Sequence, residues 1–328
     1  MTTRGEPGMA PSGAAGGPAP PLARAGPSPG ALEAELGPDL WTLVAPLGAP
    51  VIEAVPVTTI RWSGSPRASF RLTLADGRVL KGRRFRTPAD VIRVSSLTPL
   101  LDPMHFPRVL TSHGCALLTP WIAGEPATPE SWTPGRLRAC GGVQGALHRV
   151  SVPSEVAALQ PRTLPWTERL DWWLRELVAA GALDAPRARQ IHRLVAGSAP
   201  VTSRPGVCHT DFCGDNIVIT DGGRIAVVDN EGLSLDAPEF DLARTWYRWP
   251  LTPPQLRAYA EGYGTHPHTA GFEAHFLHWA LLAVLDSAAY RTRAGTPTAQ
   301  VPLDRLATLV RTEGRDESFP RILTRGGR

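Results

Sequence analysis

One acidic stretch, from Val207 to Asp241, constrains the fold of this chain more than any other part of the sequence. Between His209 and Asp241 it holds eight carboxylates and one arginine. Carboxylates that crowd together repel one another and resist ionisation unless a cation binds among them. Hard cations such as Mg²⁺ take oxygen ligands, so the stretch indicates a fold that gathers carboxylates around a bound cation.

A predicted hairpin, residues 217–228, lies at the centre of this stretch. Two β-branched segments flank the turn Asp-Gly-Gly at residues 221–223. These turn residues accept positive φ, so the pattern predicts two antiparallel strands. Counting back from the turn places Asn216 beside Val228 or Asp229 at the open end of the hairpin, where paired side chains lie roughly 5 Å apart.

An amide and a carboxylate therefore converge at the open end of the hairpin. Mg²⁺ usually takes only one or two oxygen ligands from the protein, and the rest come from water and phosphate. Asn216 and Asp229 meet this requirement. Asp211 lies five residues before Asn216, in a loop that leads to the same end. We therefore expect Asp211 to face whatever the metal holds.

The order of these residues resembles a known family. His209-x-Asp211-x4-Asn216, followed by a hairpin and Asp229, is similar to the catalytic and metal-binding segments of the protein-kinase-like phosphotransferases. Protein kinases have Arg in the second position of the loop and Phe-Gly after the later Asp. Here Thr210 and Asn230-Glu231 occupy these places. The resemblance is therefore closest to the branch of aminoglycoside phosphotransferases and choline kinases.

This resemblance implies a role for each residue of the stretch. Asp211 would accept or orient the proton of a substrate hydroxyl, and His209 would brace the loop. Asn216 and Asp229 would hold Mg²⁺. Glu231 would either bind a second metal ion or support the ligands of the first.

Further along, the same resemblance gives Asp241 a structural role, supporting the catalytic loop. A leucine-histidine pair at the end of a predicted helix, Leu147-His148, also resembles the small-molecule kinases. On its own, His148 is better explained as a packed helix residue than as a catalytic one.

Lys81 is the only lysine among the 34 basic residues of the chain. A single lysine among arginines suggests a site that needs a compact ammonium group rather than a planar guanidinium. In the resembled family, a lysine on the third strand contacts the nucleotide phosphates. The helix expected at residues 88–100 has no glutamate to pair with Lys81. Asp90, Asp229 or the nucleotide itself therefore remain as the groups that orient it, and a solvated surface lysine is the alternative.

Two other segments are candidates for nucleotide binding. The loop at residues 64–69 has one glycine, so phosphate contacts would come from its backbone N–H groups and from hydroxyls such as Ser65. The segment at residues 116–125 resembles the strand and hinge that join the two lobes of the family. Backbone groups near Thr119 and Trp121 would bond the adenine there, while Pro120 has no N–H to offer.

Composition and periodicity divide the chain into three parts. Residues 1–30 are rich in Gly, Pro and Ala and predict a disordered tail. Residues 31–122 combine leucines at helical spacing with a sheet of about five strands, the last two expected at 107–110 and 115–122. Residues 123–328 are expected to be mainly helical, with one long helix over 270–292. Together with the resemblance, this predicts an α+β fold of two lobes, a small antiparallel-sheet lobe and a larger helical lobe.

Several other classes of protein are disfavoured. The net charge of +4 comes from scattered arginines, which argues against nucleic-acid binding. Without an apolar run of 18 residues, no membrane-spanning helix is expected. The four cysteines form no disulfide pattern, so we expect a reducing cytoplasm. A zinc site at Cys208, His209 and Cys213 lacks a fourth ligand at a recognisable spacing.

The sequence thus predicts an ATP-dependent and Mg²⁺-dependent kinase that phosphorylates a hydroxyl group on a small molecule, with GTP as a possible alternative donor. The catalytic motif does not identify the acceptor, because phosphoryl transfer needs little beyond positioning and charge neutralisation. A nucleotide-binding pseudokinase without turnover is the alternative, motivated by the missing helix glutamate and the glycine-poor loop. A protein kinase is the third hypothesis.

Overall fold

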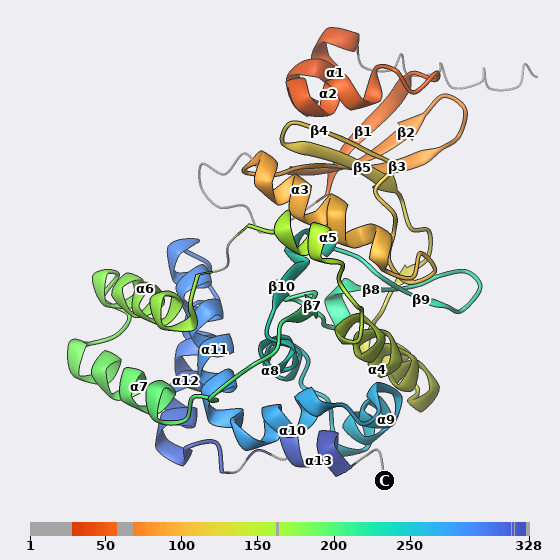
Figure 1. Ribbon diagram of the computed structural model, residues 1–328. Coiled ribbons are helices and arrows are strands. Elements are labelled where there is room, and N and C mark those ends of the chain that lie inside the picture. Colours follow the sequence, from red (N-terminus) through yellow and green to blue (C-terminus); the bar gives the residue numbers. More distant parts are fainter. Residues whose placement is uncertain (1–27, 58–67, 162–163, 316, 318, 326–328) are drawn as a thin grey trace, which may run out of the picture.

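The computed structural model describes residues 28–57, 68–161, 164–315, 317 and 319–325, which form a small sheet lobe above a larger helical lobe (Figure 1). This arrangement confirms the predicted α+β fold of two lobes. In the described part of the chain, no helix is both long enough and apolar enough to cross a membrane.

The sheet lobe contains five antiparallel strands in the order β1-β2-β3-β5-β4. Their bounds are β1 Val51–Val57, β2 Ala68–Leu74, β3 Val79–Arg84, β4 Thr111–His113 and β5 Ala116–Pro120. The expectation of a strand at 107–110 is wrong, because the ladder with β5 begins only at Thr111. Pro107 has no N–H for such a ladder, and Leu110 adds one bond to the carbonyl oxygen of Leu118.

The two faces of this sheet have different functions because side chains alternate along each strand. One face packs against the short helices α1 Pro29–Leu36 and α2 Pro38–Val44, whose leucines bury at the predicted helical spacing. Glycine and proline at positions 37 and 38 separate these two helices. The other face carries Lys81 and Thr119 and, with helix α3 Pro88–Leu97, borders the space between the lobes.

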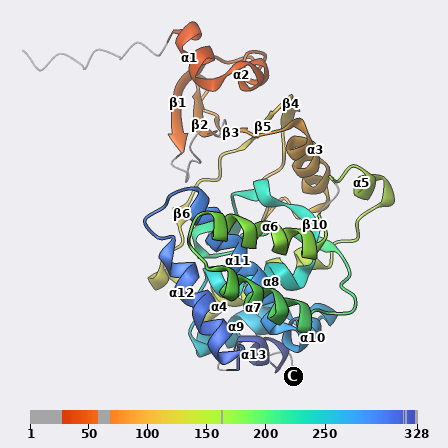
Figure 2. The ribbon, with the colours of Figure 1, turned by 90° about the vertical axis from the view of Figure 1, so that its left-hand side faces the viewer.

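The helical lobe surrounds α11 (Figure 2). Most side chains of this helix are buried from Phe276 to Ala289. The expected helix at 270–292 is two helices, because His275 leaves helical geometry with φ −119° and ψ 29°. The helices are α4 Pro134–His148, α5 Ser154–Ala158, α6 Trp166–Ala179, α7 Ala185–Gly197, α8 Pro238–Arg248, α9 Pro253–Tyr263, α10 Pro267–Ala274, α11 Phe276–Arg293, α12 Gln300–Thr312 and α13 Phe319–Arg325.

Short strands of the helical lobe carry the acidic stretch to the lobe boundary. They are β6 Glu125–Pro126, β7 Gly206–Cys208, β8 Ile217–Ile219, β9 Ile225–Val227 and β10 Ser234–Asp236. Strands β8 and β9 form the predicted hairpin, with Ile217 opposite Val227. The N–H of Val228 donates to the carbonyl oxygen of Asn216 at 2.9 Å, so Asn216 lies beside Val228, as the turn predicted.

Helices α4 and α9 pack so closely that glycine is required where they cross. A Cβ atom on Gly141 would lie 2.0 Å from the carbonyl oxygen of Tyr259, and one on Gly262 would lie 1.8 Å from that of Arg138. Both contacts are with backbone atoms, which cannot rotate away as the end of a flexible side chain can. By contrast, a Cβ atom on the neighbouring Gly142 would make only an ordinary contact, at 3.6 Å.

We therefore expect alanine at these two adjacent positions of α4 to have opposite effects on stability. Gly141→Ala should lower the free energy of unfolding by about 1–3 kcal/mol, because it forces the helices apart. Gly142→Ala should raise it by about 0.5–1 kcal/mol, because alanine favours helix more than glycine does. Urea unfolding of both variants measures the difference, and equal changes would contradict the close packing.

Candidate active site

The loop that carries Asp211 is anchored by a buried carboxylate on helix α8. Asp241 accepts hydrogen bonds from the backbone N–H groups of His209 at 3.2 Å and Thr210 at 2.6 Å. Thr210 adopts a left-handed conformation with φ 64°, which a β-branched residue rarely does. The two bonds to Asp241 hold this turn, so that the chain reverses just before Asp211.

The Asp241 carboxylate is fully buried, and two side chains of α4 bond to it. Gln144 donates to it at 3.2 Å, and the Nε2 atom of His148 lies 2.9 Å from the same oxygen. The other ring nitrogen of His148 bonds to the Tyr263 hydroxyl at 2.7 Å. Burial alone would raise the pKa of Asp241, but the hydrogen bond and charge of His148 hold it below the usual 3.8. The sequence expectation of a supporting role for Asp241 agrees with this geometry.

His209 joins the loop that carries Asp211 to the end of the hairpin. Its Nδ1 atom accepts from the N–H of Asp211 at 3.3 Å, so the proton of the ring resides on Nε2. That nitrogen lies 3.1 Å from both the Val228 carbonyl oxygen and the Asn230 side-chain oxygen. The imidazole therefore bonds to both segments, in keeping with a bracing residue.

Asp211 and Asn216 lie together, as their spacing predicted. The Asn216 amide donates to the Asp211 carbonyl oxygen at 2.8 Å and to its carboxylate at 3.1 Å. Both bonds use the NH₂ group, which leaves the amide oxygen of Asn216 for a metal ion.

Asp229 pairs with Lys81 across the boundary between the lobes. The ammonium nitrogen lies 2.8 Å from the carboxylate, and Asp229 adopts a left-handed conformation with φ 62°. Burial would raise the pKa of Asp229, but Lys81 and, more weakly, Arg83 lower it below 3.8. Asp90 instead pairs with Arg93 at 3.0 Å. Of the groups considered from the sequence, Asp229 is thus the one that this structure places on Lys81.

Glu231, the other expected metal group, is paired with a cation in this structure. Its carboxylate lies 2.5 Å from the guanidinium of Arg83, two residues beyond Lys81 on β3. Arginine is the ordinary cation of this chain, so nothing in the sequence distinguishes Arg83.

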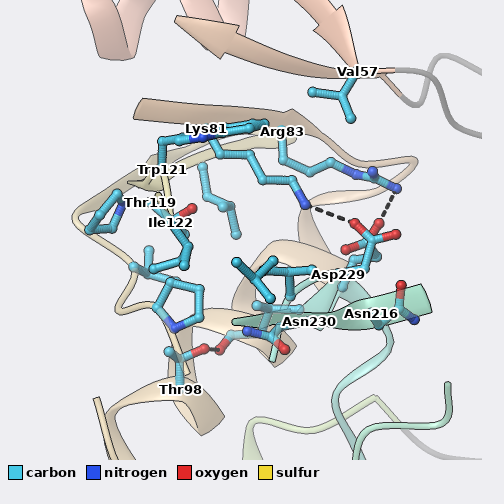
Figure 3. A pocket seen from close by; sticks show the side chains of 18 of the residues that line it. Val57, Lys81, Arg83, Thr98, Thr119, Trp121, Ile122, Asn216, Asp229 and Asn230 are labelled. Carbon is cyan, nitrogen blue, oxygen red and sulfur yellow. Dashed lines mark hydrogen bonds and ion pairs between the residues drawn. The ribbon is translucent and has the colours of Figure 1, made fainter. Parts of the chain in front are cut away.

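A cavity of about 360 Å³ lies between the lobes and brings most of these residues together (Figure 3). Lys81 and Asp229 meet on one side of it with Asn216 below them, while Thr119 of β5 and Trp121, which directly follows β5, lie on the opposite side. The N–H of Trp121 donates to the Val79 carbonyl oxygen at 3.1 Å. Apolar walls come from Val57, Val94, Val109, Leu117, Ile122 and Ile217. Ser65 lies outside the described residues.

Two arginines of α8 approach Asp211, and the sequence analysis missed both. Arg244 donates to the Asp211 carboxylate at 3.2 Å, to the Thr210 carbonyl oxygen at 2.9 Å and to Asp286 of α11 at 2.7 Å. Arg248 lies 3.7 Å from the same oxygen of Asp211. Their spacing of four residues on one helix, directly after Asp241, was the available sequence signal.

Fold and cavity together define a two-lobed, kinase-like protein with its candidate site between the lobes. A family model of the phosphotransferase enzyme family matches residues 57–275, which is more than half of the chain. The chain therefore belongs to this family, as the motif predicted. A comparison with curated proteins finds no significant match.

Solved structures share the fold at low sequence identity. A choline/ethanolamine kinase family protein from Mesorhizobium loti is 19% identical with a TM-score of 0.60, and the match covers 91% of this chain and 98% of that one. A thermostable mutant of an aminoglycoside phosphotransferase is 17% identical with a TM-score of 0.63, covering 83% and 98%. A spectinomycin phosphotransferase, solved with ADP and spectinomycin, is 16% identical with a TM-score of 0.56, covering 87% and 97%.

We expect Asp241→Asn to destabilise the protein by about 3 kcal/mol at neutral pH, because an amide NH₂ would face backbone donors in a buried site. The folded pKa of Asp241 is depressed, so its ionisation stabilises the fold above pH 3.8 and this contribution is lost as the pH falls through the lowered pKa. The free energy of unfolding should therefore fall less steeply below pH 3.8 in the variant than in the wild type.

Urea unfolding from pH 7 to pH 3 tests this expectation. Asp221→Asn, at the exposed turn of the hairpin, removes the same charge without a buried partner and serves as the control. If both variants followed the wild-type pH profile, Asp241 would not be the ionised anchor of the loop.

Proposed function

We propose that the protein is an ATP-dependent small-molecule kinase that transfers the γ-phosphoryl group to a hydroxyl of its acceptor. The observation that carries the proposal is that Lys81 of the sheet lobe meets the acidic stretch of the helical lobe at one interlobe cavity. Lys81, Asn216 and Asp229 line this cavity, Lys81 pairs with Asp229 at 2.8 Å, and Asp211 lies beside it, bonded to Asn216 at 3.1 Å. The residues thus supply a phosphate-binding cation, metal ligands and a base, the parts that phosphoryl transfer requires.

The residues at the end of the hairpin fit a magnesium ion. Asp229 offers a carboxylate. Asn216 offers its amide oxygen, because its NH₂ group already donates to Asp211. Glu231 is a further candidate. When bound, Mg²⁺ would neutralise phosphate charge and orient the phosphate chain. In this proposal Lys81 contacts the phosphates, Asp211 takes the proton from the acceptor hydroxyl, and His209 keeps the loop in place.

The cavity suits a nucleoside. Its apolar walls can enclose a purine ring, and Thr119 and Trp121 lie on the side where the hinge joins the lobes. Complexes of related folds with ADP, and of an amicoumacin kinase with AMP-PNP, support nucleotide binding at such a site. GTP is the alternative donor. Ser65 and backbone N–H groups of its loop are further proposed phosphate contacts.

The pseudokinase alternative rests on the absence of a glutamate in α3 and on the glycine-poor loop at residues 64–69. Here the partner of Lys81 is Asp229, so the lysine is held within the cavity without that glutamate. The base and both proposed metal ligands are also present, which favours an enzyme. We further propose that residues 31–122 and 123–328 act as the nucleotide-binding and catalytic lobes of a cytoplasmic protein.

We expect nucleotide binding to depend on Mg²⁺ and on Asp229. A ligand at a hundredfold excess over its Kd adds about 2.7 kcal/mol to the stability of the folded state. Thermal unfolding with ATP, GTP and ADP, each with and without Mg²⁺, should therefore show a rise in Tm that is largest with the metal and is lost in Asp229→Ala. The absence of any shift at millimolar nucleotide would refute the proposal.

We expect Asp211→Ala to lower turnover by about 10²–10⁴-fold, because it removes the general base while leaving the nucleotide site intact. The measurement is release of ADP from Mg·ATP, with water and with a panel of hydroxyl-bearing acceptors. Asp221→Ala, on the exposed turn, is the matched control. Unchanged turnover, or loss of the nucleotide-induced Tm shift, would exclude this role for Asp211.

A further inference from the structure

Strand β3 presents two cations, not one, to the interlobe cavity. Lys81 and Arg83 are two residues apart, so they lie on the same face of the strand. The cross-strand partner of Arg83 on this face is Ser69 of β2. The side chains of Lys81 and Arg83 both line the cavity, and Figure 3 shows them running side by side toward Asp229. Arg84 lies on the opposite face, with its guanidinium 5.5 Å from the ring centre of Phe70.

The guanidinium of Arg83 is buried and incompletely bonded. Arg83 is 7% exposed, and its terminal nitrogens reach the Ser69 hydroxyl and the Glu231 carboxylate. Its Nε–H is buried and has no hydrogen-bond partner among the described residues. A buried guanidinium with an unused donor is costly, since each lost bond to water goes uncompensated.

The charges of the cavity indicate which ligand would use this cation. Lys81 and Arg83 are balanced by Asp229 and Glu231 in the free protein. A triphosphate brings more negative charge than a single ammonium can neutralise, and a planar guanidinium matches two phosphate oxygens at once. In the free protein, the Glu231 carboxylate makes the ion pair with Arg83 that a phosphate group would make.

We propose that Arg83 is a second phosphate-binding residue, which Glu231 holds in place until the nucleotide arrives. The inference builds on the proposed kinase function and adds a specificity to it. Lys81 and Arg83 together would favour di- and triphosphates over monophosphates, with Arg83 bonded to the β- or γ-phosphate. The alternative is that Arg83 only positions Glu231 and never contacts the ligand.

Calorimetric titration with ATP, ADP and AMP, without metal and with Mg²⁺, separates these roles. Arg83→Gln should weaken ATP binding by about tenfold to a hundredfold, the range of one charge-assisted hydrogen bond, and AMP binding by less than about twofold. Arg84→Gln makes the same charge change on the other face and should leave the ratio of ATP to AMP affinity unchanged. Equal weakening of ATP and AMP by Arg83→Gln would overturn the proposal.

Glu231→Gln provides a test of opposite sign, without removing the cation. If Arg83 binds phosphate, loss of the competing carboxylate should strengthen metal-free ATP binding by a few fold. If Arg83 only positions Glu231, this variant should weaken ATP binding as Arg83→Gln does, and the proposal would fall. The Glu231→Gln variant also distinguishes the two roles of Arg83 if Arg83→Gln does not fold. If the wild type binds nucleotide and Arg83→Gln keeps the same preference for ATP over AMP, only this inference is overturned. If the wild type binds no nucleotide, the proposed kinase function is overturned as well.

Discussion

The buried carboxylate of Asp241 is the interaction on which the geometry of the site depends. A left-handed turn at a β-branched residue costs on the order of 1–2 kcal/mol, and it forms at Thr210 because two backbone N–H groups converge on Asp241. The carboxylate has no contact with solvent, so its charge must be met by donors from the loop and from α4. Helix α8 thereby fixes the loop, and the same helix then directs Arg244 and Arg248 at Asp211.

The second constraint is the repulsion among the carboxylates of the acidic stretch. The structure meets part of it with cations from the sheet lobe, while arginines of the helical lobe contact Asp211. Lys81 pairs with Asp229, Arg83 pairs with Glu231, and Arg93 of α3 donates to the carbonyl oxygens of Glu231, at 3.1 Å, and of Leu233. The Arg83–Glu231 pair is largely shielded from solvent, whereas the Asp229 side chain is 38% exposed, so salt screens the Lys81–Asp229 pair more strongly. These contacts therefore neutralise part of the acidic stretch and also join the two lobes.

The sequence predicted those parts of the site that depend on neighbours in the chain. The turn at residues 221–223 fixed the register of the hairpin and hence the place of Asn216 beside Val228. Leucine spacing and the glycine-proline break predicted α1 and α2. Lys81 stood out because the chain has no other lysine.

The remaining features depend on contacts between segments far apart in the sequence. Lys81 and Asp229 are separated by 148 positions, and no local pattern chooses between Asp229 and Asp90 as the partner. Arg83 could not be distinguished from the other arginines, because its role depends on the face of the sheet on which it lies. His275 breaks an otherwise helical pattern and bonds to the Ser198 carbonyl oxygen, 77 positions away.

Asp211, the proposed base, is oriented before any acceptor arrives. One of its carboxylate oxygens accepts from Arg244 and the other from Asn216. Arg244 is itself fixed by the Thr210 carbonyl oxygen and by Asp286, so an entering hydroxyl would share an oxygen with a guanidinium that cannot easily move. Because phosphoryl transfer depends chiefly on positioning, such a restrained carboxylate loses little freedom on reaching the reactive geometry. The arginines of α8 thus join the acceptor side of the site to the anchor at Asp241.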